Sequence, residues 1–315
     1  MIMIRVSQGL GNQMFQYALG EIIKLDMKEE VLYDTTFIAD YISGRKMRDI
    51  ADIFDWNFRI AKMSDIRRVS GKICFEIPVV YSLIKHNEKV FHLFNSILWK
   101  FRIKKAVEIN EPEYWNLSDN FTEYIKSINF SHSDNYYLNG FWESVDYIAD
   151  KREFLRKVFK FRVDEETIRI GKEISKVNSI SVHVRRGDYV SKSGNEIDFM
   201  MCDEEYYKIC IEDLMNRVDN PKIYVFSDDV DYAKRLLEKY TCVEFIIGKK
   251  DYEDMYLMSM CLNNIITNST FSFWAAFLNK NDNAIVKCPQ VHYRKKVIGG
   301  WKNVEFPRMT QWEPV

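Results

Sequence analysis

The residues best suited to chemistry lie in one short segment that follows an apolar strand. Residues 180–184 alternate as a strand, and two arginines, a glycine and an aspartate come directly after it. Ligands of open α/β sheets bind beyond the carboxyl ends of the strands. Arg185 and Arg186 can hold a diphosphate through bidentate hydrogen bonds, and Asp188 can accept a proton from a substrate hydroxyl. The alternative is a surface loop with an arginine–aspartate pair.

The composition limits the class of protein. A chain of 315 residues is long for one hydrophobic core and suits two domains. Hydrophobic residues make up 47% of the chain and aromatic residues 15%, which excludes a disordered protein. The formal net charge of -1 argues against a general nucleic-acid binder, so we expect no nucleic-acid partner.

The cysteines and the apolar segments indicate in which compartment of the cell the protein works. The six cysteines have neither a C-x-x-C motif nor metal-ligand spacing, so we interpret them as free thiols of a cytoplasmic protein. The apolar run at the start of the chain is too short for a signal peptide, and no run of about 18 apolar residues is present to span a membrane. We expect a cytoplasmic protein, with peripheral contact at the inner membrane face left open.

Strands and helices alternate along much of the chain. In the first half we predict strands at 2–6, 31–34 and 136–141, with a helix that ends near residue 27. In the second half the predicted strands, each separated from the next by a helix, are 179–184, 222–226, 243–247, 264–267 and 284–287. Such alternation is typical of parallel sheets with helices on both faces. We therefore expect an α/β protein with two Rossmann-like domains that face each other across a cleft.

Polar clusters follow three strands of the second half, at residues 183–188, 227–229 and 268–270. The last cluster leads into a predicted helix, whose free N–H groups and positive dipole end suit an anion. The alternative is an ordinary N-cap made by one of residues 268–270. Residues 227–229 can likewise cap a helix or bind a metal, but two aspartates without a third nearby ligand are weak evidence for a metal.

A glycine-containing turn follows the first strand. The sequence from Gly9 to Gln13 resembles half of a dinucleotide-binding fingerprint, but Met14 stands where its third glycine is expected. We interpret the turn as backbone that lies close to a ligand or to the facing domain, with Asn12 and Gln13 supplying amides. The chain has no Ser-His-Asp or Cys-His order and no H-x-x-x-H motif, which disfavours metal-based and nucleophile-based hydrolysis.

Several segments together resemble glycosyltransferase family 11, the α-1,2-fucosyltransferases that use GDP-fucose. They occur in the order typical of the family and span residues 9 to 276, which is most of the chain. The segments are GLGNQMFQYA at 9–18, NGFWES at 139–144, HVRRGDY at 183–189, FSDD at 226–229, DMYLM at 254–258 and NSTFSFWAA at 268–276.

The resemblance implies a GT-B fold in which residues 1–155 form the acceptor-side domain and residues 156–315 bind the donor. It implies inverting transfer of fucose from GDP-fucose to the 2-hydroxyl of a galactoside, with no metal and no other cofactor. The implied acceptor is a galactose-terminated glycan of bacterial surface polysaccharide synthesis, either free or lipid-linked.

The family motifs also imply roles for single residues. Arg185 is expected to hold the donor diphosphate with help from backbone amides at the start of the last helix. Asp254 and His183 are expected at the nucleoside end, where a carboxylate can accept both N–H groups of the guanine edge. The other donor-binding residues expected are Ser227, Asp228, Asn268, Ser269, Thr270 and Phe271.

The sequence leaves open which group removes the proton from the acceptor. Asp188 has the type and place of a base, but the positive charge of the neighbouring arginines weakens it in that role. Related fucosyltransferases work with weak or indirect bases, and then Asn12 and Gln13 only orient the hydroxyl. Two other functions stay open: a transferase of the same fold with another acceptor or linkage, and a non-catalytic nucleotide-sugar or glycan-binding protein.

Residues 85–105 form a basic amphipathic segment, KHNEKVFHLFNSILWKFRIKK, in which Glu88 is the one acidic residue. We favour a helix that packs its apolar stripe into the N-terminal domain over one that lies on an anionic membrane. The protein is then expected to stay in the supernatant after sedimentation with anionic liposomes at low salt. Co-sedimentation with the liposomes would instead establish a surface helix.

Overall fold

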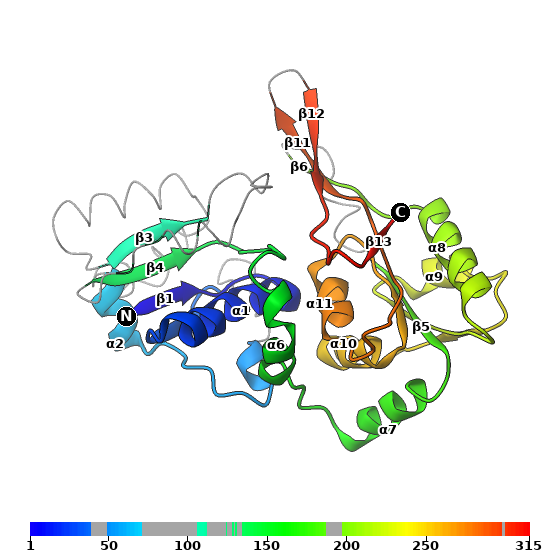
Figure 1. The fold of residues 1–315 in the computed structure, drawn as a ribbon, viewed down its shortest axis with the longest axis horizontal. Helices are drawn as coiled ribbons and strands as arrows, with labels where there is room; N and C mark the ends of the chain where they lie inside the picture. The colour runs from blue at the N-terminus through cyan, green and yellow to red at the C-terminus, as the bar shows by residue number, and fades with distance from the viewer. Residues whose placement is uncertain are drawn as a thin grey trace. The chain divides into compact units, whose positions relative to one another are not determined.

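The computed structural model describes residues 1–38, 49–70, 106–111, 124, 128, 130, 134–186, 197–297 and 300–315. The chain divides into two compact units, Met1–Lys151 and Arg152–Val315 (Figure 1). None of the helices within the described ranges is long and apolar enough to cross a membrane. Two features of the sequence analysis, the candidate base Asp188 and the basic segment 85–105, lie outside the described residues.

The first unit is built on a four-stranded parallel sheet with the order β2-β1-β4-β3. From β1 the chain continues to β2 on one side of β1, and it later returns to form β3 and β4 on the other side. The strand order therefore reverses between β1 and β4. The elements are β1 (Ile2–Arg5), α1 (Leu10–Met27), β2 (Val31–Asp34), η1 (Ile50–Asp52), α2 (Met63–Ser70), β3 (Ala106–Asn110), β4 (Asn135–Asn139) and η2 (Ala149–Lys151).

One buried side chain joins the segments that follow β1 and β4. The Gln16 amide oxygen accepts a hydrogen bond from the Ser7 backbone N–H at 2.9 Å, and its nitrogen donates to the Gly140 carbonyl at 2.9 Å. Gln16 is completely buried, so both bonds form away from water, where an unpaired amide would be costly. The two loops at the reversal point of the sheet are therefore fixed to each other.

The second unit is built on a six-stranded parallel sheet with the order β13-β10-β9-β5-β7-β8. Numbered along the chain within this sheet, the strands read 3-2-1-4-5-6, the order of Rossmann sheets. The elements are α6 (Arg152–Val158), α7 (Glu165–Ile174), β5 (Ser179–Val184), α8 (Glu204–Arg217), β7 (Lys222–Ser227), α9 (Val230–Leu236), β8 (Val243–Phe245), α10 (Asp251–Met260), β9 (Asn263–Ile265), α11 (Thr270–Leu278), β10 (Val286–Cys288) and β13 (Glu313–Pro314).

The central strand β5 shows why the sequence analysis predicted this sheet well. All six of its residues are buried, as expected for a parallel strand with helices on both faces. The strands and helices predicted for the second half are confirmed, with small shifts at their ends. The expected α/β class with parallel sheets is also confirmed.

A three-stranded antiparallel sheet of the second unit escaped prediction. It has the order β12-β11-β6, with β6 at Ile197–Phe199, β11 at Val291–Val297 and β12 at Gly300–Glu305 (Figure 1). The sequence VHYRKKV of β11 places three cations in a row, which hides the alternation of a strand. Asn268 ties this sheet to the start of α11, because its side-chain nitrogen donates to the carbonyls of Met200 and His292.

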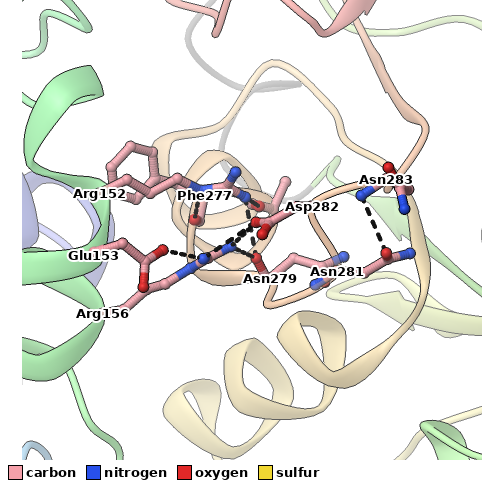
Figure 2. Close-up of polar contacts among 9 residues, drawn as sticks. Arg152, Glu153, Arg156, Phe277, Asn279, Asn281, Asp282 and Asn283 are labelled. Carbon is pink, nitrogen blue, oxygen red and sulfur yellow. Dashed lines mark hydrogen bonds and ion pairs between the residues drawn. The ribbon is translucent and has the colours of Figure 1, made fainter.

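Two arginines of α6 hold the carboxyl end of α11. Arg152 donates from Nε to the Phe277 carbonyl at 2.8 Å and from Nη2 to the Asn279 carbonyl at 3.0 Å. Arg156 also donates to the Asn279 carbonyl and pairs with Asp282 at 3.4 Å (Figure 2). These carbonyls end a helix and lack partners within it, and cations favour the negative end of the dipole. The two arginines thus fix the position of α11.

The Arg152→Ala variant should lower the free energy of unfolding of the second unit by about 2–3 kcal/mol, because buried carbonyls lose a charged donor. Urea unfolding followed by circular dichroism measures this change. The control is Lys157→Ala, which removes an exposed cation from the same helix. Equal stability of the two variants would contradict the anchoring role of Arg152.

Candidate functional site

Three strand ends of the second unit meet at one edge of the sheet. β5 pairs with β7 and with β9, and the register sets Val184 opposite Ser227 and Val182 opposite Ile265. The segments that follow these strands therefore emerge side by side. The strand order reverses between β5 and β9, and ligands of open α/β sheets bind in the crevice at such a point.

Asp228 fixes the two residues that follow β5. Its Oδ2 lies 3.0 Å from Nη1 of Arg185, and its Oδ1 accepts a hydrogen bond from the backbone N–H of Arg186 at 2.9 Å. The guanidinium of Arg186 lies over the Tyr232 ring, 4.2 Å from its centroid. The Arg185 side chain is 35% exposed, so an anion can reach a guanidinium that Asp228 already orients.

Ser227 and Asp229 complete the loop after β7. The Ser227 hydroxyl accepts a hydrogen bond from the Asp229 N–H at 3.0 Å, and the Asp229 carboxylate accepts one from the Tyr232 N–H at 3.0 Å. This is the helix cap that the sequence analysis weighed against a metal site. Within the described ranges no group of three or more His, Cys, Asp and Glu side chains is placed to hold a metal ion.

The amino end of α11 follows β9 at the same edge. Ser269 is the N-cap residue, and its hydroxyl accepts a hydrogen bond from the Phe271 N–H at 3.3 Å. The first turn contains no acidic residue, so the positive end of the helix dipole is not offset there. Thr270 begins the helix and is partly exposed, whereas Asn268 is buried and occupied with β11.

His183 lies just before the end of β5, and its ring centroid is 5.4 Å from that of Phe271. The side chain is buried, and its Nδ1 has no hydrogen-bond partner among the residues described. Burial, with the positive charge of Arg185, lowers the pKa of His183 to about 3. The imidazole is therefore neutral near pH 7, with one ring nitrogen available to a ligand.

Asp254 lies in the first turn of α10, which packs against α11 (Figure 1). Its Oδ1 is buried and accepts no hydrogen bond from the described part of the chain. Burial, followed by the charges of Asp251 and Glu253, raises the pKa of Asp254 to about 7.

The amide residues expected in the first unit differ in their surroundings. Gln13 is completely buried, where its nitrogen donates to the Gln8 carbonyl at 2.8 Å and its oxygen accepts from the Ile50 N–H at 3.2 Å. These bonds hold the backbone at both places, and contact of Gln13 with a substrate hydroxyl stays a prediction. Asn12 is partly exposed in the first turn of α1.

The sequence analysis missed a pair of carboxylates in the first unit. Glu111 follows β3 and Glu143 follows β4. Burial raises the pKa of Glu111 to about 8, and the negative charge of Glu143 adds to this rise. Glu143 belongs to the NGFWES motif, which was recognised without a role for any of its residues. Glu111 lies in no recognised motif. It comes close to the loop after β4 because β3 pairs with β4.

Comparisons with known proteins agree with this arrangement. The model of Glycosyl transferase family 11 matches residues 1–296. The Alpha-1,2-colitosyltransferase of Escherichia coli is 28% identical over 307 residues, which cover 95% of each protein. The O-antigen biosynthesis glycosyltransferase WbnK of Escherichia coli is 27% identical over 315 residues, which cover 95% of this chain and 99% of WbnK.

Among solved structures, the fucosyltransferase NodZ from Bradyrhizobium gives a TM-score of 0.53 at 12% identity, over 97% of this chain and 99% of NodZ. A NodZ crystal soaked with GDP-fucose gives 0.50. This likeness confirms the GT-B type of α/β fold that the sequence predicted.

Proposed function

The chain belongs to glycosyl transferase family 11, and we propose that it transfers fucose from GDP-fucose to the 2-hydroxyl of a galactose in a glycan. The observation that carries the proposal is the juxtaposition of Arg185 with the amino end of α11 at the reversal point of the second sheet. Both groups bind anions, and the donor is a nucleoside diphosphate ester. The second unit is thus assigned to the donor.

The diphosphate is the leaving group, and its negative charge grows as the bond to the sugar breaks. Arg185 supplies a fixed positive charge there, and the N–H groups at the start of α11 supply aligned dipoles. Asp228 acts indirectly, since it orients Arg185 and holds the backbone of Arg186. Electrostatic stabilisation of this kind usually makes the largest contribution to catalysis.

Two buried atoms that have no hydrogen-bond partner among the described residues, Asp254 Oδ1 and His183 Nδ1, support a nucleoside site. The Asp254 carboxylate, whose Oδ1 is buried, can accept the N1–H and N2–H of guanine, an edge that adenine does not offer. A ring nitrogen of His183 can donate or accept one hydrogen bond with the donor substrate while the ring stays neutral. Both contacts would satisfy groups that are costly to leave unpaired.

A donor that carries colitose is the second candidate, because a relative that matches most of this chain is named a colitosyltransferase. Colitose is fucose without its 3-hydroxyl, so the two donors differ by one polar group. A site that bonds this hydroxyl would reject the deoxy sugar strongly. Both GDP-sugars therefore belong in the first assay.

For the acceptor we propose a galactose-terminated glycan of O-antigen synthesis, since WbnK is named for that process. The glycan would be bound by the first unit. Linkage of this glycan to a lipid carrier is a further part of the proposal. Peripheral contact of residues 85–105 with an anionic membrane is the less favoured alternative, and the liposome experiment tests it.

The first experiment mixes the protein with GDP-fucose or GDP-colitose and lactose, and it measures free GDP and the linkage of the product. We expect an α-1,2-linked product and equal rates with and without excess EDTA, because Asp228 and Asp229 are engaged by protein donors. Loss of activity in EDTA that Mg²⁺ or Mn²⁺ restores would reassign those aspartates to a metal. GDP binding without any product would favour a non-catalytic binder.

The Arg185→Lys variant keeps the charge and loses the planar fork. We expect turnover to fall at least ~100-fold, as for the loss of one donor to the transition state. Arg235→Lys, at an exposed arginine of α9, is the matched control and should keep the wild-type rate. A folded Arg185→Lys protein with wild-type turnover would exclude the diphosphate role.

A further inference from the structure

The loop after β4 lies at the reversal point of the first sheet, the position at which sheets of this type receive ligands. Gln16 fixes the start of this loop at Gly140 to the segment after β1. The loop contains Glu143, a carboxylate to which neither the donor site nor the proposed leaving-group chemistry assigns a task.

The backbone before Glu143 is held by a second carboxylate. Glu111 accepts hydrogen bonds from the N–H of Phe141 at 2.7 Å and from the N–H of Trp142 at 2.6 Å. The approach is close, since a Cβ on Gly140 would lie 2.4 Å from the Glu111 Cβ. Glycine at 140 therefore permits the brace, and the brace sets the direction of the chain that leads to Glu143.

Trp142 adds strain to this rigid loop. Its φ is 60°, in the left-handed region that bulky residues rarely adopt, although its side chain is completely buried. Its carbonyl accepts a hydrogen bond from the Tyr147 hydroxyl at 2.6 Å. Strained backbone that its surroundings hold in place is concentrated at functional sites, where it points a neighbouring group in a required direction.

Glu143 itself is partly exposed and receives no hydrogen bond or ion pair from the residues that the structure describes. The protein around its carboxylate removes water from the charged form, and this desolvation raises the pKa of Glu143 to about 7. Besides burial, the negative charge of Glu143 raises the pKa of Glu111 and of Tyr147, and the charge of Glu111 raises that of Tyr124. None of these described neighbours is a cation, so none offsets the cost of the charge on Glu143. An unpaired carboxylate at such a place is poised to take a proton.

We propose that Glu143 is the general base that accepts the proton of the acceptor hydroxyl. The inference rests on the proposed transfer function and replaces Asp188 in that role. In the step, the hydroxyl oxygen forms a bond to C1 of the donor sugar, and its proton moves to the Glu143 carboxylate. The bond from C1 to the diphosphate oxygen breaks, and its electron pair leaves with GDP. Glu111 is a positioning residue that holds the loop.

The test compares the pH dependence of transfer in Glu143→Gln, Glu143→Asp, Asp188→Asn and the wild type, with GDP-fucose and lactose as probes. The base must be ionised, so wild-type kcat/KM for the acceptor should rise with pH up to about 7 and then level off. Glu143→Gln should lower kcat ~100-fold or more and lose this rise. Glu143→Asp, which keeps a carboxylate, should retain it.

Two controls separate chemistry from folding. Asp146→Asn changes an exposed carboxylate of the same loop and should leave rate and pH dependence unchanged. Glu143→Gln should bind GDP in calorimetry as the wild type does and melt at an equal or higher temperature, since it removes an unpaired charge.

The outcomes are distinct. A Glu143→Gln enzyme with wild-type turnover and the same rise overturns the proposal, as does loss of the rise in Asp188→Asn alone. If the wild type transfers neither fucose nor colitose, the proposed transfer function is wrong, and the proposed role of Glu143 as its base is wrong as well.

Discussion

The orientation of α11 is the constraint on which the candidate donor site depends. Arg152 and Arg156 hold its carboxyl end by donating to carbonyls that the helix leaves unpaired. Its other end follows β9, at the edge where the strand order of the sheet reverses. Cations bind the carboxyl end of α11, and its first turn contains no acidic residue. The positive end of the helix dipole is therefore held in place and is not offset. Arg185 adds its charge at the same edge, so fold and electrostatics favour an anion at one place.

Much of the second unit could be predicted from its sequence because its parallel strands are buried on both faces. β5 has six buried residues and agrees residue for residue with its prediction. The polar residues that follow β5, β7 and β9 were also found, because a parallel sheet must bring them to one edge. The contacts among them could not be found. That Asp228 holds Arg185 and Arg186 depends on the pairing of β5 with β7, which no local pattern encodes.

Residue type alone does not show which partner an amide side chain meets. Gln13 stands in a motif rich in glycine and amides, yet its side chain is buried and holds the backbone at Gln8 and Ile50. Asn268 lies among the residues predicted to bind the donor, and its side-chain nitrogen donates to the carbonyl of His292 in β11, a strand whose consecutive cations concealed it. An amide can serve a ligand or the backbone equally well, and only the tertiary structure shows which of the two it meets.

The two sheets place different chemistry at equivalent points. In the second, the reversal between β5 and β9 gathers arginines and a helix terminus, groups that favour negative charge such as that of the proposed leaving group. In the first, the reversal between β1 and β4 gathers the carboxylates Glu111 and Glu143 and no described cation at hydrogen-bond distance from Glu143. A cation there would lower the pKa of Glu143 and weaken it in the proposed role of base. The groups described at the two reversal points therefore differ in charge, and each set suits the step proposed for its own unit.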